Sequence, residues 1–153
     1  MPTLAPHEAT SAPQRNEQQV KTQRSTRVLL VEDEPLTAEV FARALSRDGH
    51  VVDVARDGLQ ALRRLRERLP SLVVLDMSLP AGSGAEVVRE LRAAGHLDLP
   101  IVVVSGSERS QSTLSADELW PGAWLVKPIK PRSLVAIVRE LTERPDGSLP
   151  PHG

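Results

Sequence analysis

The chain has 153 residues, of which 40% are hydrophobic and 25% charged, and its formal net charge is −1. This length and composition predict one globular domain with a single core. The sequence contains no cysteine, which excludes a disulfide scaffold, a cysteine-ligated zinc site, an iron–sulfur cluster and a thiol enzyme.

Localisation and nucleic-acid binding are constrained by the same composition. No apolar run approaches the roughly 18–20 residues that a membrane helix needs, and the N-terminus lacks the apolar core of a secretory signal. We therefore expect a cytoplasmic protein that does not contact a membrane. The chain has no basic excess and only three aromatic residues, so we also expect no nucleic acid to be bound by this chain.

The two ends of the chain predict tails. Residues 1–26 contain three prolines and few large aliphatic residues, so they cannot bury enough surface to offset the entropy lost on ordering. Residues 144–153 are rich in proline and glycine and predict a flexible C-terminal tail. One folded domain is expected between them, over 27–143.

Short apolar runs alternate with helical periodicity inside this domain. The predicted strands cover 27–32, 50–55, 71–76, 100–105 and 123–126. Helices are predicted after Pro35, from Leu59, around Val87 and around Leu134. Between the last two strands, the segment 106–120 is polar, and we expect a short, loosely packed helix there.

The alternating order predicts an α/β fold, in which a parallel sheet is covered by helices on both faces through right-handed crossovers. Ligands of such sheets bind outside the carboxyl ends of the strands. The polar residues at these ends are Glu32, Asp33, Glu34, Asp76, Ser105 and Lys127. We therefore expect one polar crevice at this edge of the sheet.

The charges at the strand ends predict what this crevice binds. Two carboxylates about 4 Å apart repel by roughly 4 kcal/mol at an effective dielectric constant of about 20. Asp33 and Asp76 therefore need a cation, and a site built from oxygen atoms suits Mg²⁺. Lys127 can neutralise an anion at the same place. With the hydroxyl of Ser105, this set predicts phosphoryl transfer in which Asp76 attacks the phosphoryl group.

Each of these features alone has an ordinary structural explanation. Acids after a strand are often solvated turn residues, and a Lys-Pro pair is usually a plain loop. The functional interpretation depends on their occurrence together at four strand ends.

Four motifs together resemble the receiver domain of bacterial two-component response regulators. They are VLLVEDEP (28–35), VVLDMSLPAGSG (73–84), IVVVSG (101–106) and WLVKPIKP (124–131). The resemblance covers 27–143. It implies a flavodoxin-like, doubly wound five-stranded parallel sheet in the order 2-1-3-4-5, with about five helices.

The resemblance also implies a phosphoacceptor and a metal site. Asp76 would accept the phosphoryl group, and Mg²⁺ would be the cofactor. Asp33 and Asp76 would bind the ion directly, Glu32 would hold it through water, and Ser78 would offer its backbone carbonyl.

A switch is implied in the same way. Ser105 would close on the phosphoryl group, and Lys127 would pair with it beside a cis Lys127–Pro128 peptide bond. Trp124 stands where the family has a rotating aromatic residue, which is mostly tyrosine or phenylalanine. The family also carries a Gly-Ala pair some four residues earlier, whereas Gly122 and Ala123 directly precede Trp124 here.

The implied function is that of a phosphorylatable signalling protein. A sensor histidine kinase or a histidine phosphotransfer protein would supply the phosphoryl group, and an unknown downstream protein would respond to it. The chain would not be an enzyme beyond catalysing its own phosphorylation and dephosphorylation. No output domain is predicted after Leu141.

Two alternatives stay open on the sequence, and a third is disfavoured. The fold could serve as an interaction module that is independent of phosphorylation, or the chain could be the receiver fragment of a larger regulator. A haloacid-dehalogenase-like phosphatase is disfavoured, because such enzymes need a second aspartate where Ser78 stands.

Overall fold

The structure, a computed structural model, describes residues 26–79 and 84–143. Its strands are β1 (Arg27–Val31), β2 (Val51–Ala55), β3 (Leu72–Asp76), β4 (Ile101–Ser105) and β5 (Gly122–Val126). Its helices are α2 (Pro35–Arg47), α3 (Gly58–Glu67), α4 (Gly84–Ala93), α5 (Ala116–Leu119) and α6 (Pro131–Thr142), with a 3₁₀ turn at Arg109–Gln111.

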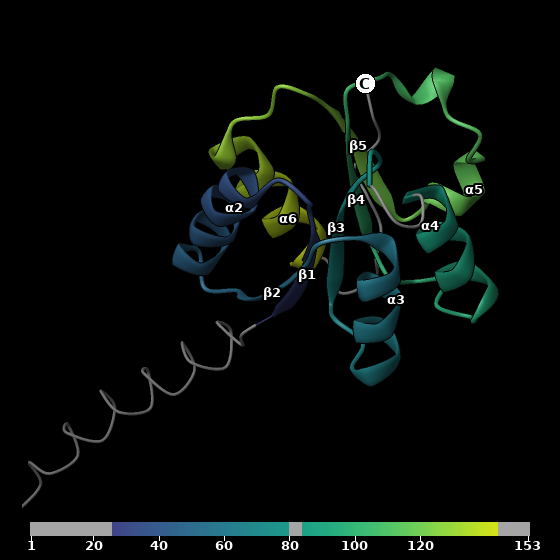
Figure 1. Ribbon diagram of the computed structural model, residues 1–153, viewed down its shortest axis with the longest axis horizontal. Helices are drawn as coiled ribbons and strands as arrows, with labels where there is room; N and C mark the ends of the chain where they lie inside the picture. The colour runs from purple at the N-terminus through teal and green to yellow at the C-terminus, as the bar shows by residue number, and fades with distance from the viewer. Residues whose placement is uncertain (1–25, 80–83, 144–153) are drawn as a thin grey trace, which may run out of the picture.

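The five strands form one parallel sheet in the order β2-β1-β3-β4-β5, which confirms the predicted topology (Figure 1). The crossover helices lie on both faces, with α2 and α6 on one and α3, α4 and α5 on the other (Figure 1). Alternate side chains of the strands therefore enter two cores, because successive residues of a strand point to opposite faces. None of the helices described is long and apolar enough to span a bilayer.

The core strands are apolar because both of their faces are covered. Every residue of β3 and of β4 is buried. On one face Phe41 and Leu45 of α2 pack with Leu134 and Val138 of α6 against the sheet. This packing fixes the strand ends at which the polar residues lie.

The segment before β5 contains a short helix, as predicted, and two of its leucines are buried. Its helix α5 has four residues and begins at Ser115, whose side chain forms a capping box with Glu118. Leu114 and Leu119 are buried in the core. The guanidinium of Arg92 on α4 donates to the Glu118 carbonyl at 2.9 Å, a contact that the sequence pattern did not reveal.

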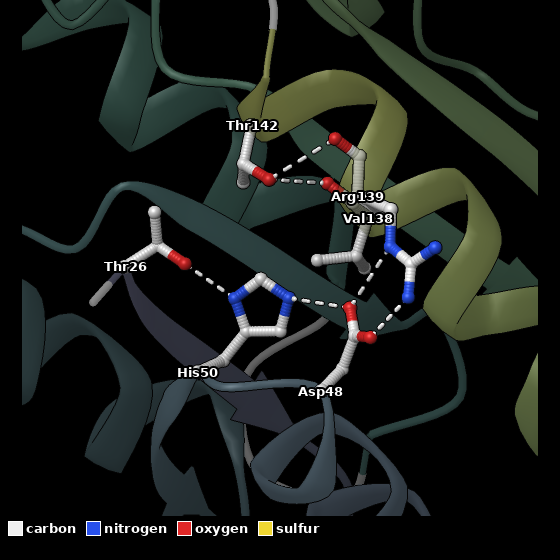
Figure 2. Close-up of polar contacts among 6 residues, drawn as sticks. All are labelled: Thr26, Asp48, His50, Val138, Arg139 and Thr142. Carbon is white, nitrogen blue, oxygen red and sulfur yellow. Dashed lines mark hydrogen bonds and ion pairs between the residues drawn. The ribbon is translucent and has the colours of Figure 1, made fainter. Parts of the chain in front are cut away.

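A polar cluster joins the residues just before β1 and β2 to helix α6, at the edge of the sheet where these two strands begin (Figure 2). The His50 ring contacts the Thr26 hydroxyl on one side. Its Nε2 lies 3.5 Å from an oxygen of Asp48, within ion-pair distance but without hydrogen-bond geometry. The Asp48 carboxylate also accepts from the guanidinium of Arg139 on α6.

This cluster places residue 26 within the fold. The Thr26 carbonyl also accepts from the backbone N–H of Val51 at 2.8 Å. The remainder of the predicted N-terminal tail, 1–25, and the predicted C-terminal tail, 144–153, lie outside the described residues.

The Asp48→Asn substitution is expected to destabilise the domain at neutral pH but not in acid. The Arg139 guanidinium holds the pKa of the Asp48 carboxyl below its ordinary value of 3.8. A lowered folded-state pKa contributes stability above the unfolded pKa, and that contribution disappears as the pH falls through the folded value. Urea unfolding should therefore show a lower free energy of unfolding for the variant than for wild type at pH 7. This difference should shrink below about pH 4.

Glu67→Gln serves as the control, because Glu67 is an exposed acid of α3. Its substitution should leave the unfolding free energy nearly unchanged at either pH. If the difference in unfolding free energy between wild type and Asp48→Asn stays constant from pH 7 to pH 2, the carboxylate charge is not what stabilises this cluster.

Candidate functional site

Three carboxylates meet at the carboxyl ends of β1 and β3. One oxygen each of Glu32, Asp33 and Asp76 lies within 4.8 Å of the others. Glu32 and Asp76 are each only 3% exposed, whereas Asp33 faces solvent. The structure thus brings together the acids that the sequence predicted, two of them buried and one accessible.

The backbone of the sheet holds Asp76 in place. Asp76 is the last residue of β3 and lies opposite Val104 of β4. Its Oδ1 accepts from the backbone N–H of Ser78 at 2.8 Å, and its Oδ2 accepts from the Lys127 ammonium at 3.0 Å. One oxygen is therefore bound by the following loop and the other by the lysine after β5.

Lys127 reaches the site from the end of β5. Its backbone N–H donates to the Ser105 carbonyl at 2.7 Å, which extends the pairing of β4 and β5 by one residue. The Lys127–Pro128 peptide bond is cis, as the resemblance implied, and so is Trp120–Pro121.

The site has an excess of negative charge. Burial is the main cause that raises the pKa of Glu32 to about 7, and the nearby charge of Asp76 adds to it. The backbone N–H of Glu34 and the ammonium of Lys127 act in the opposite direction. The single ammonium of Lys127 does not balance the negative charge of this cluster, so a bound cation would be favoured.

The donor set fits Mg²⁺. All three side chains offer carboxylate oxygens, which are the ligands that this hard cation prefers. The cluster lacks a nitrogen or sulfur ligand, since its members are glutamate and aspartate alone. Asp33 is the accessible member, and it can bind an ion from solvent together with the inner pair.

Ser105, whose carbonyl accepts from the Lys127 N–H, shares one hydrogen-bond partner with Trp124. Ser105 ends β4, is buried, and its Oγ accepts from the backbone N–H of Ser107 at 3.1 Å. The half-buried indole of Trp124 donates to the Ser107 carbonyl at 2.9 Å. The two predicted switch residues are thus connected through Ser107, which the sequence analysis did not single out.

The sequence analysis also missed how closely α4 approaches Asp76. A Cβ on Gly84 would lie 2.8 Å from the Met77 sulfur and 3.1 Å from the Asp76 carbonyl oxygen. Glycine at this position therefore lets α4 begin against the end of β3. The sequence motif 73–84 ends on this glycine, but the sequence alone does not show that Gly84 contacts the end of β3.

Comparison with known families settles the class of domain. Residues 28–139 match the response regulator receiver domain. The chain belongs to this family.

Curated relatives agree with this assignment. The receiver domain is 34% identical over 120 residues to the response regulator MprA of Mycobacterium ulcerans, covering 78% of this chain and 51% of the relative. It is 37% identical over 118 residues to the DNA-binding response regulator MtrA of Mycolicibacterium smegmatis, covering 77% of this chain and 51% of the relative. The chain thus spans about half the length of these relatives.

Solved structures show the same fold. The response regulator TrrA from Thermotoga maritima, in complex with Mg²⁺-BeF, is 30% identical with a TM-score of 0.66, covering 74% of this chain and 96% of that one. A receiver domain from Methylobacillus flagellatus is 33% identical with a TM-score of 0.64 and the same coverage, 74% and 96%. The second of these is described as CheY-like, and both likenesses agree with the predicted flavodoxin-like fold.

Proposed function

We propose that this receiver domain accepts a phosphoryl group on Asp76, with Mg²⁺ as cofactor, and thereby changes its contacts with other proteins. One observation carries the proposal. The Asp76 carboxylate is buried, is held by Lys127, and lies against two further carboxylates at the ligand-binding edge of the sheet.

The family works with sensor kinases, so the proposed donor is the phosphohistidine of a histidine kinase or of a histidine phosphotransfer protein. A carboxylate oxygen of Asp76 would form the new P–O bond while the P–N bond of the donor breaks. Lys127 would neutralise the phosphoryl oxygens, since its ammonium is already 3.0 Å from Asp76. Mg²⁺, when bound, supplies further charge neutralisation for the transferring group.

The remaining residues have supporting roles in this proposal. Asp33 and Asp76 would bind Mg²⁺ directly, Glu32 through water, and Ser78 through its carbonyl. The Ser105 hydroxyl would leave the Ser107 N–H and close on a phosphoryl oxygen, and Trp124 would respond. The domain would catalyse no reaction other than its own phosphorylation and dephosphorylation.

Acetyl phosphate tests this proposal, because it can supply the phosphoryl group without a kinase. Incubation with Mg²⁺ should shift the protein on a phosphate-affinity gel, and EDTA should prevent the shift. A protein that stays unshifted with acetyl phosphate and Mg²⁺ would favour the alternative of an interaction module independent of phosphorylation.

The Asp33→Asn substitution is expected to weaken Mg²⁺ binding at least tenfold. It removes one negative charge and one strong oxygen donor from the accessible side of the cluster. Isothermal titration calorimetry with MgCl₂ measures the dissociation constant directly.

Glu39→Gln is the matched control for this prediction. Glu39 is an exposed acid on α2 that pairs with Arg43, so its substitution removes the same charge from the protein surface. An unchanged dissociation constant for Asp33→Asn, or an equal loss in both variants, would mean that Asp33 does not bind the ion.

A second candidate follows from the span of the relatives. Because this chain matches about half of each, it could be the receiver portion of a longer regulator. In that case the phosphorylated domain would act on an output region in the same polypeptide. Sequencing the gene beyond codon 153 distinguishes this arrangement from a separate signalling protein.

A further inference from the structure

Helix α5 is too short to be stable without help. It contains four residues, Ala116–Leu119, which is about one turn. Isolated helices need roughly 12–15 residues to form in water. Its order must therefore come from its capping box and from contacts with neighbouring elements.

Arg92 on α4 supplies one of these contacts. Its guanidinium is half-buried and donates to four backbone carbonyls. The acceptors are Glu118 at 2.9 Å, His96 at 2.7 Å, Leu99 at 2.8 Å and Pro121 at 3.4 Å. One planar side chain thus joins the last turn of α5 to the end of α4 and to the residues just before β4 and β5.

Arg89 binds the other side of the same segment. Its guanidinium donates to the carbonyl and the hydroxyl of Thr113, at 3.2 and 3.1 Å. It also lies 3.4 Å from the Glu118 carboxylate, which closes the capping box of α5. Arg89 and Arg92 are three residues apart and so lie on one face of α4.

The preceding segment, 106–111, is held differently. The Ser107 N–H donates to the Ser105 hydroxyl, and the Ser107 carbonyl accepts from the Trp124 indole. Both partners are the residues that the proposed switch moves. A displacement of either side chain therefore changes its hydrogen bond to Ser107.

We propose that Arg89 and Arg92 join α5 to α4 as one rigid unit. The conformational change at the phosphorylation site is then confined to segment 106–111 and Trp124, and the α4–α5 surface stays fixed. The first statement rests on the contacts of the two arginines alone. The second rests on the proposed function.

Amide hydrogen exchange, followed by NMR without Mg²⁺, tests the first statement. The reporters are the amides of Leu119 and Trp120, which donate to the Ser115 and Ala116 carbonyls. In Arg92→Lys and in Arg89→Gln, exchange at both amides should be about tenfold faster, the effect of losing a hydrogen bond to a charged group. Arg63→Lys, at an exposed arginine of α3, should leave both rates unchanged.

The two substitutions keep this test independent of folding. Arg89 is 47% exposed, so its substitution leaves the core intact even if Arg92→Lys fails to fold. Unchanged exchange at Leu119 and Trp120 in Arg89→Gln, with the overall fold intact, would overturn the proposal. So would wild-type exchange at these amides far faster than at the Ala94 amide at the end of α4.

Beryllofluoride with Mg²⁺ tests the second statement. The amide resonances of Ser105 and Ser107 and the indole N–H resonance of Trp124 should shift. The amide resonances of Leu119 and Trp120 should not. Equal shifts in both groups would overturn the confinement of the change. The absence of any shift at Asp76 and Ser78 would instead contradict the proposed function and leave the exchange result for α5 standing.

Discussion

The Asp76→Asn variant is expected to take up no phosphoryl group from acetyl phosphate. The amide of asparagine is not a nucleophile, and the remaining carboxylates do not share the setting of Asp76. Among the acids in the described part of the chain, only Asp76 has one oxygen bound by the Ser78 N–H and the other by the Lys127 ammonium. Phosphate-affinity electrophoresis should show the shifted band in wild type and none in the variant.

The matched control is Asp53→Asn. Asp53 belongs to the edge strand β2 and pairs with Arg27, away from the acidic site. Phosphoryl uptake should be the same as in wild type. A shifted band in Asp76→Asn, with a melting temperature close to that of wild type, would place the phosphoacceptor on another residue, and peptide mapping would identify it.

The fold was predictable because apolar residues recur at different spacings in strands and in helices. The stretches 72–75 and 101–104 are apolar at every position, and they lie in β3 and β4 of the sheet. Helical spacing was less reliable at single positions. Leu36 and Leu59 are apolar residues in the first turns of α2 and α3, but they are 70% and 61% exposed. At 100° per residue, Leu36 lies about 180° from the buried Leu45.

The site was predictable to the extent that it consists of side chains at strand ends. Glu32, Asp33, Asp76 and Lys127 follow apolar runs, and a parallel sheet brings such residues to one edge. Their burial and pKa values could not be predicted, because both depend on neighbours from other strands. The raised pKa of Glu32, about 7, results mainly from burial that the structure alone reveals.

Contacts made by the backbone were not predictable. The carbonyls that bind Arg92 come from four positions between His96 and Pro121, and any residue type carries a carbonyl. Ser107 likewise joins Ser105 to Trp124 through its main chain. The prediction of a short, polar helix within 106–120 therefore did not include the contacts that hold α5.

Gly122→Ala is expected to destabilise the domain by about 3 kcal/mol, near the upper end of the usual cost of forcing an extra carbon into a packed core. A Cβ at this position would lie 2.1 Å from the Ile101 carbonyl oxygen and 2.8 Å from the Leu119 carbonyl oxygen. Both neighbours are backbone atoms, so no side chain can rotate away. Relief requires β5 to separate from β4 at the pair Ile101–Gly122.

Thermal unfolding measures this effect, which corresponds to a melting temperature lower by about 10 °C for a domain of this size. Gly106→Ala is the control, because a Cβ there meets nothing within 4 Å. Its unfolding free energy should stay within about 0.5 kcal/mol of wild type. Equal melting temperatures for the two variants would mean that the start of β5 can move away from β4 at little cost. The close approach of α5 to this strand would then not be part of what holds the α4–α5 unit against the sheet.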